Sequence, residues 1–370
     1  MSTPLGAILH EAFGTRVVAM PMFPGIFEET VEFPPMADIP DLGQVLNKML
    51  YWFAITLMWF VFKPTLDKCR ALASLPPVTW RGIKYSMKQK NMPIHHTWST
   101  VLHPKPADWD PETTIGGYMF YDKPSNALLP DLEEFLNAGS PPVYVGFGSM
   151  PVHMSSKFVP LIKQLLEFLP KDMRVIVYAG GMSNLTTDSS SRAGLKNELL
   201  SLDTTKSGRI HVVYSVPQHL LFPRCSVIVH HGGSGTTGEA CRSGVPSMAC
   251  PLVGDQYFWA KRIAAIGCGP AIGVAFRKMT GKYLAGKILE ALEPKHVEVA
   301  KLVGEKIRAE TGTDNAVDFI MKHLFEERQE KNEYILINSY PDVSELTKST
   351  SDLKLIFGSR LIKRTFGKKG

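Results

Sequence analysis

The sequence predicts an α/β protein built around a doubly wound parallel sheet. Between residues 142 and 310, short apolar runs alternate with segments of helical length, which is the pattern of parallel strands covered by helices on both faces. One of these runs leads directly into a glycine-rich turn at 230–235. The chain has 370 residues, of which 44% are hydrophobic, enough for two domains of ordinary size. We therefore expect a complete domain at 142–313.

Five strands and the helices between them make up this expected domain. The strands are predicted at Val143–Phe147, Arg174–Tyr178, Ile210–Tyr214, Val227–Val229 and Pro246–Val253. Helices are predicted at 156–168, after Pro217, from Thr236 onward and at Phe258–Ile266, and three more follow residue 280, the last at about 314–328. This order, with a helix in most crossovers, is typical of a parallel sheet.

The first 121 residues hold too few strands for a complete sheet. They contain segments at Ala7–Phe13 and Val17–Met20, a proline-rich passage at 21–40 and an aromatic helix at 47–62, and one short strand is predicted near Thr114–Tyr118. Prolines surround a short acidic helix at 122–141, as in a linker between domains. We therefore expect a partial N-terminal domain at 1–121 and a linker at 122–141.

Two segments of the sequence are compatible with contact to a membrane surface. The longest apolar run, Met49–Phe62, is shorter than the roughly 20 residues that cross about 30 Å of hydrocarbon. It predicts either a core helix or a helix close to an apolar acceptor or a membrane surface. The tail at 329–370 carries six Lys or Arg residues and no acid from Lys354 onward. We expect either a flexible, solvated tail or a segment attracted to anionic lipid.

Composition and local patterns exclude several classes of protein. The net charge of +6 is modest, and no basic patch is interleaved with aromatics in the manner of a nucleic-acid-binding module. The first residues lack the basic region and apolar core of a secretory signal. The five cysteines form no CxxC pair and no spacing that suits zinc. We expect a cytoplasmic protein with free thiols, no metal site and no nucleic-acid partner.

The turn after Val227–Val229 carries the strongest functional signal. Glycines at 232, 233 and 235 let backbone approach a ligand closely, and a helix that begins beside them points free N–H groups and its positive dipole end at that ligand. Ser234 and Thr236 add hydroxyls, and His231 adds a ring N–H. Donors gathered in this way predict a phosphate or diphosphate site.

Polar residues after the neighbouring strands complete the candidate site, because ligands of parallel sheets gather at the carboxyl ends of the strands. Ser149 follows the first strand, and Gln218 follows Pro217 as a partner for a base or ribose. Glu239 lies one turn into the helix, where it could accept from ribose hydroxyls. Asp255 and Gln256 follow the fifth strand and suit sugar hydroxyls. Phosphate and sugar sites side by side predict a nucleotide-sugar.

A dinucleotide site is the weaker alternative. Gly233, Gly235 and Gly238 satisfy GxGxxG, and Asp255 lies near the position of a ribose-binding acid. However, the motif follows the fourth strand rather than the first, and the helix before Val245 is short. Gln256 and the two histidines would also have no role.

Several segments of the chain resemble the UDP-glycosyltransferases, and most closely their sterol 3-beta-glucosyltransferase branch. They are WSTVLHPKPADWDP, GGYMFYD, PPVYVGFGSMPV and HHGGSGTTGEACRSGVPSMACPLVGDQYFWAKRIAAIGCGP, and the similarity covers most of residues 1–325. The resemblance implies a two-domain GT-B architecture with two Rossmann-like domains, the C-terminal one complete and the N-terminal one incomplete. It implies inverting, metal-independent transfer of glucose from UDP-glucose, with no cofactor, to a sterol or similar lipid hydroxyl. It also implies that a final helix at 314–328 crosses back to the N-terminal domain.

The resemblance assigns a role to each candidate residue. It implies that Ser149, His231 and the turn from Gly233 through Ser234 and Gly235 to Thr236 contact the diphosphate. Val216 and Gln218 would meet the uracil, Glu239 the ribose, and Asp255 with Gln256 the glucose. Plant members of the family stack a tryptophan on uracil where this chain has Ser215.

The start of the chain departs from the family pattern. Family members begin with a strand, a glycine-rich loop and a histidine that serves as the general base, and the resemblance begins after all three. His10 matches a helical position downstream of that base. We therefore expect an N-terminally truncated chain with no catalytic residue of its own that we can identify. The alternatives are a non-catalytic remnant that binds UDP-sugar or lipid, and a transferase that acts on small phenolic acceptors.

Overall fold

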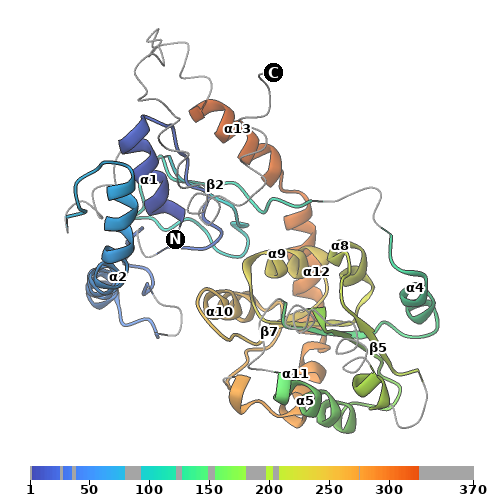
Figure 1. Ribbon diagram of the computed structural model, residues 1–370. Helices are drawn as coiled ribbons and strands as arrows, with labels where there is room; N and C mark the ends of the chain where they lie inside the picture. The colour runs from blue at the N-terminus through green and yellow to red at the C-terminus, as the bar shows by residue number, and fades with distance from the viewer. Residues whose placement is uncertain are drawn as a thin grey trace, which may run out of the picture. The chain divides into compact units, whose positions relative to one another are not determined.

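The computed structural model describes residues 2–25, 28–35, 39–79, 93–121, 127–148, 155–180, 197–202, 208–274 and 276–324. The predicted site residue Ser149, part of the expected linker and the expected tail at 329–370 lie outside these residues. Figure 1 shows the chain as a ribbon.

Five parallel strands form the sheet of the C-terminal half, as expected. They are β3 (Val143–Gly146), β4 (Val175–Tyr178), β5 (Ile210–Val213), β6 (Val227–His230) and β7 (Ser247–Ala249), in the order β5-β4-β3-β6-β7. All four pairings are parallel. Because both faces of the sheet are covered, the strand residues are almost all buried and the strands appear in the sequence as continuous apolar runs.

Helices cover the sheet on both sides, which makes it doubly wound. On one face, Val143 and Val145 pack in a core cluster with residues of α5 (Ser155–Phe168) and α11 (Gly281–Ala291), and these two helices lie side by side in Figure 1. On the other face, Tyr144 packs with residues of α4 (Pro130–Asn137) and α8 (Gln218–Leu221). A short 3-10 helix, Phe222–Arg224, follows α8. Alternate residues of one strand therefore serve two separate cores.

Some predicted boundaries shift in the structure. Strand β7 ends at Ala249 rather than Val253, and Pro251 lies beyond it, where its missing N–H cannot extend the ladder. Helix α9 (Ser234–Ser243) begins two residues before Thr236, with Gly233 as its N-cap, and ends at Gly244 in the left-handed region. Helix α10 (Gln256–Ile266) begins at Gln256 instead of Phe258. Helices α12 (Pro294–Arg308) and α13 (Gly312–Leu324) complete the three predicted after residue 280.

The N-terminal part contains two helices and a small parallel sheet. Helix α1 spans Ser2–Phe13 and α2 spans Gln44–Leu72. Strands β1 (His95–His96) and β2 (Thr114–Ile115) pair in parallel, and Ala19 bridges Ile94 beside them. The segment Val17–Met20 contributes one bridge to this region, and β1 was not predicted because two adjacent histidines carry no strand signal.

The sequence allowed helix α2 to be either a core helix or a helix close to an apolar surface. The structure shows that it is not a core helix. It is 29 residues long, continues through Pro64, and extends well beyond the predicted 47–62. Large apolar side chains such as Trp52 and Phe60 are 60% and 66% exposed. A helix that is apolar on all sides is buried only when other parts of the protein cover every side. One side of α2 is covered by none of the described residues.

Residues 93–121 pack closely against the C-terminal half. Trp98 and Tyr118 share a core cluster with Trp259 of α10 and Ile307 of α12. Asn315 Nδ2 of α13 donates to the carbonyl oxygen of Gly116 at 2.8 Å. Residues Met1–Glu326 accordingly form one compact unit, and the domain boundaries expected at 121 and 142 stay a prediction.

Candidate functional site

The loops after β3 and β6 meet at the point where the strand order reverses. Gly146 and His230 are paired at the carboxyl ends of these strands, with β4 on one side and β7 on the other. In open α/β sheets this switch point leaves a crevice in which ligands bind. The ring of His231 lies across it, because a Cβ on Gly148 would lie 2.5 Å from His231 Cε1. Gly148 also has φ +64°, a conformation that other residues adopt at a cost.

The first turn of α9 points into this region with its backbone donors. Gly233 caps the helix without a side-chain hydrogen bond, and the first intrahelical bond runs from Thr237 N to Gly233 O at 2.9 Å. The amides of the preceding residues therefore have no partner within the helix. Gly235 is exposed, and a Cβ there would meet no atom within 4 Å. The arrangement can accept an anion at the end of a ten-residue helix.

His231 contributes an uncommitted nitrogen to the same region. Its Nδ1 is buried and has no hydrogen-bond partner among the described residues. Burial lowers the pKa of His231, so its ring is neutral at pH 7 and can donate one N–H. A Cβ on Gly233 would lie 2.5 Å from His231 Nε2, so the glycine makes room for the ring.

The neighbouring His230 has a different role. It is fully buried, and its Nδ1 accepts from the Gly232 amide at 3.1 Å. Burial, with a smaller contribution from His231, lowers the pKa of His230 to about 3. Gly232 has φ +90°, and a Cβ there would lie 2.9 Å from Gln256 O. His230 thus stabilises the turn that presents His231.

Asp255 and Gln256 lie beside the start of α9, after β7. Burial raises the pKa of the Asp255 carboxyl, and hydrogen bonds from its own amide and the Ser234 amide oppose the rise. The Gln256 Oε1 accepts from Leu252 N at 2.8 Å and Val253 N at 3.2 Å. The oxygen of Gln256 therefore holds its own loop, which sequence reasoning did not foresee.

Contacts from the N-terminal part hold α9 in place. The Ser234 Oγ donates to the Met22 carbonyl oxygen at 2.7 Å, so this hydroxyl is already used. A Cβ on Gly238 would lie 2.8 Å from the ring of Tyr118, so glycine allows the helix to pack on that ring. Tyr118 was missed in the sequence, because nothing local indicates that it meets a helix more than a hundred residues away.

The remaining predicted residues contact other side chains of the protein. Glu239 Oε1 pairs with Arg242 at 3.7 Å, and the Arg242 guanidinium lies 4.3 Å from the Phe120 ring centre. Gln218 begins α8 and hydrogen-bonds the buried Tyr144 hydroxyl, while Val216 packs against the same core cluster. All of them follow the carboxyl ends of strands. The structure brings together His231, the turn at 233–236, Asp255 and Gln256, and places Val216 and Gln218 after β5.

The chain is similar to several known proteins. Residues 196–319 match the C-terminal domain family of the erythromycin biosynthesis protein CIII type. The chain is 31% identical over 331 residues to sterol 3-beta-glucosyltransferase UGT80B1 of Arabidopsis thaliana, covering 86% of this chain and 48% of that protein. It is 34% identical over 324 residues to the sterol 3-beta-glucosyltransferase of Pichia angusta, covering 85% and 24%. A crystal structure of the kitacinnamycin glycosyltransferase superposes with a TM-score of 0.55 at 18% identity, covering 75% and 67%.

The fold is of the GT-B type found in glycosyltransferases. The structural likeness at 18% identity establishes the fold alone. The chain is similar in sequence to two sterol 3-beta-glucosyltransferases over 86% and 85% of its own length. It spans about half the length of the Arabidopsis relative and about a quarter of the Pichia one.

Proposed function

We propose that this chain binds UDP-glucose at the switch point between β3 and β6 and transfers glucose, with inversion, to the hydroxyl of a sterol or similar lipid. The observation that carries the proposal is the pair of amides of Gly235 and Thr236, which have no partner within α9, beside the buried Nδ1 of His231, which has no hydrogen-bond partner among the described residues. The names of the Arabidopsis and Pichia relatives support the sterol acceptor and the glucose.

In the proposed reaction, the acceptor oxygen loses its proton to a base and attacks C1 of the sugar. The bond from C1 to the diphosphate oxygen breaks, and UDP leaves with the bonding electron pair. The charge that develops on the diphosphate is greatest in the transition state, where fixed donors stabilise it most. The amides of Gly235 and Thr236 and a ring N–H of His231 are the donors of this chain. We assign the base to no residue of this chain.

The sugar would lie toward Asp255. Its half-buried carboxyl, on the N-cap residue of α10 and near the Ser234 amide, can accept hydrogen bonds from two glucose hydroxyls. Gln256 positions this loop through its oxygen. Glu239, Val216 and Gln218 are proposed to hold the ribose and the uracil. Because protein donors serve the leaving group, we expect turnover to be unaffected by a metal chelator.

Calorimetric titration and product analysis test the proposal. The chain should bind both UDP and UDP-glucose, and radiolabelled UDP-glucose with a sterol in detergent micelles should yield a labelled, lipid-soluble glucoside. A parallel panel of phenolic acceptors distinguishes the acceptor class. Binding of UDP without transfer to any acceptor would favour a non-catalytic nucleotide-sugar-binding protein. Failure to bind UDP would overturn the proposal altogether.

A further inference from the structure

Helix α2 exposes a broad apolar face to solvent. Among its exposed residues are eight large apolar side chains, at Val45, Leu46, Met49, Trp52, Phe53, Leu57, Phe60 and Val61. They recur at intervals of three and four residues and so lie on one side of the helix. The opposite side is buried and includes Tyr51, Ala54 and Ile55. Contiguous exposed apolar surface of this kind is rare unless a partner covers it.

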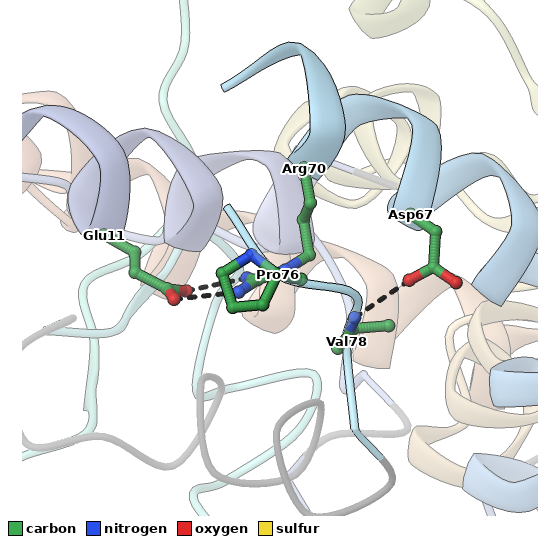
Figure 2. Close-up of polar contacts among 5 residues, drawn as sticks. All are labelled: Glu11, Asp67, Arg70, Pro76 and Val78. Atoms are coloured by element: carbon green, nitrogen blue, oxygen red, sulfur yellow. Dashed lines mark hydrogen bonds and ion pairs between the residues drawn. The ribbon is translucent and has the colours of Figure 1, made fainter. Parts of the chain in front are cut away.

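Polar contacts tie both ends of α2 to the rest of the chain. Near its start, the buried Asn47 donates to the Val31 carbonyl oxygen at 3.0 Å and to Asp41 Oδ1 at 2.8 Å. Near its end, Arg70 forms a bidentate ion pair with Glu11 of α1 at 2.7 and 2.8 Å, as Figure 2 shows.

Two more bonds secure the same end. Arg70 Nε donates to the Pro76 carbonyl oxygen at 2.5 Å, and the Val78 amide donates to Asp67 Oδ1 at 2.8 Å. By length and composition α2 could cross a membrane. Crossing would pull the buried Arg70 and Asn47 from these partners into hydrocarbon, which is costly. The helix is therefore built to lie along a surface with one face on the protein.

The charges of α2 identify the surface. The helix carries Lys48, Lys63, Lys68 and Arg70 but one acid, Asp67, which pairs with Lys63. Lys48 and Lys68 are exposed. Between Gln44 and Phe62, Lys48 is the one charged side chain. A second copy of the chain docked on this face would bring lysines against lysines, whereas an anionic lipid surface complements them.

We propose that the exposed face of α2 docks on an anionic bilayer, with Trp52, Phe53 and Phe60 inserted at the boundary between headgroups and acyl chains. An apolar face with aromatic residues and flanking lysines is the composition of helices that lie in this interface. This inference goes beyond the proposed function, because binding to a bilayer requires neither donor nor acceptor.

Vesicle sedimentation tests the proposal. Vesicles of phosphatidylcholine with about 30% phosphatidylserine should bind the chain more tightly than phosphatidylcholine alone. The triple variant Trp52→Ser, Phe53→Ser and Phe60→Ser should lower the partition coefficient at least about 100-fold, since three large apolar side chains are lost.

Two sets of variants serve as comparisons. A matched control replaces the exposed Leu289, Val297 and Leu302 of α11 and α12 by serine, and should bind vesicles as the wild type does. Charge reversal by Lys48→Glu and Lys68→Glu should weaken binding to the anionic vesicles about tenfold or more and leave phosphatidylcholine binding little changed.

Other outcomes would overturn the proposal. Unchanged vesicle binding by the triple variant would show that these side chains do not contact the bilayer. Bound chain that alkaline carbonate does not extract would indicate a membrane-spanning helix. A dimer in ultracentrifugation that the triple variant abolishes would show that a second copy covers this face. UDP affinity and circular dichroism establish that each variant is folded. If the triple variant does not fold, quenching by brominated lipids decides: it should be weaker in Trp52→Phe than in the wild type, and equal quenching would contradict the insertion.

Discussion

Replacement of His231 by alanine separates a binding role from a structural one. In the folded chain the His231 ring lies between Gly148 and Gly233, and its buried Nδ1 has no hydrogen-bond partner among the described residues. Polar contacts of the His231 side chain therefore contribute little to the stability of the fold. If the ring donates to a bound diphosphate, its loss should weaken ligand binding much more than it weakens the protein.

The sizes of the two effects follow from the same geometry. A hydrogen bond to a charged oxygen contributes about 1.5–3 kcal/mol, so the UDP dissociation constant should rise about 10- to 150-fold in His231→Ala. The variant loses the packing of one ring but also loses a buried nitrogen without a partner, whose desolvation costs about 1–3 kcal/mol. These terms oppose each other, and the free energy of unfolding should change by no more than about 1 kcal/mol.

Calorimetric titration with UDP and urea denaturation measure the two quantities on the same samples. His211→Ala is a suitable control, because His211 lies in β5, away from the crevice, with Asp131 at 3.8 Å. Its affinity for UDP should equal that of the wild type. Equal UDP affinity of His231→Ala and the wild type would refute the reasoning, and so would a loss of stability above about 3 kcal/mol, a size typical of a cavity in the core.

Three further predictions concern the site and its surroundings. Gly148→Ala should lower stability by about 1–2 kcal/mol and UDP affinity about tenfold, measured by urea denaturation and calorimetry, because φ +64° strains alanine and its Cβ would lie 2.5 Å from His231. Asp255→Ala should weaken UDP-glucose binding about tenfold and leave UDP binding unchanged; equal losses for both ligands would contradict its sugar role. Burial lowers the pKa of His103 to about 4 and that of His230 to about 3. The unfolded chain then binds protons below about pH 6.5 that the folded chain does not, so unfolding should become about 4 kcal/mol easier from pH 7 to pH 5, by urea denaturation.

The sheet of the C-terminal half could be predicted because its physics is local. Strands buried on both faces appear as runs such as Val175–Tyr178. The glycine-rich turn after β6 marks a helix start, which was predicted at Thr236 and lies at Ser234. Even the direction in which the donors point follows from the order of strand, turn and helix. The residues of the turn were therefore predictable as a group, and their assignment to a diphosphate remains a prediction.

Features that depend on distant parts of the chain could not be predicted. The hydrogen bonds from the Leu252 and Val253 amides to Gln256 Oε1 depend on the path of a loop. The packing of Tyr118 on Gly238 depends on a contact between the N-terminal and C-terminal halves of the chain. The exposure of α2 was not predictable either, because an apolar helix gives the same signal whether its outer face meets protein or not. Sequence periodicity identifies the face, and the tertiary fold decides what covers it.

A crystal structure of the chain with UDP tests the central claim most directly. The account predicts diphosphate oxygens about 3 Å from the backbone nitrogens of Gly235 and Thr236, with a ring nitrogen of His231 at a similar distance. A nucleotide bound elsewhere, with those nitrogens facing only solvent, would contradict it.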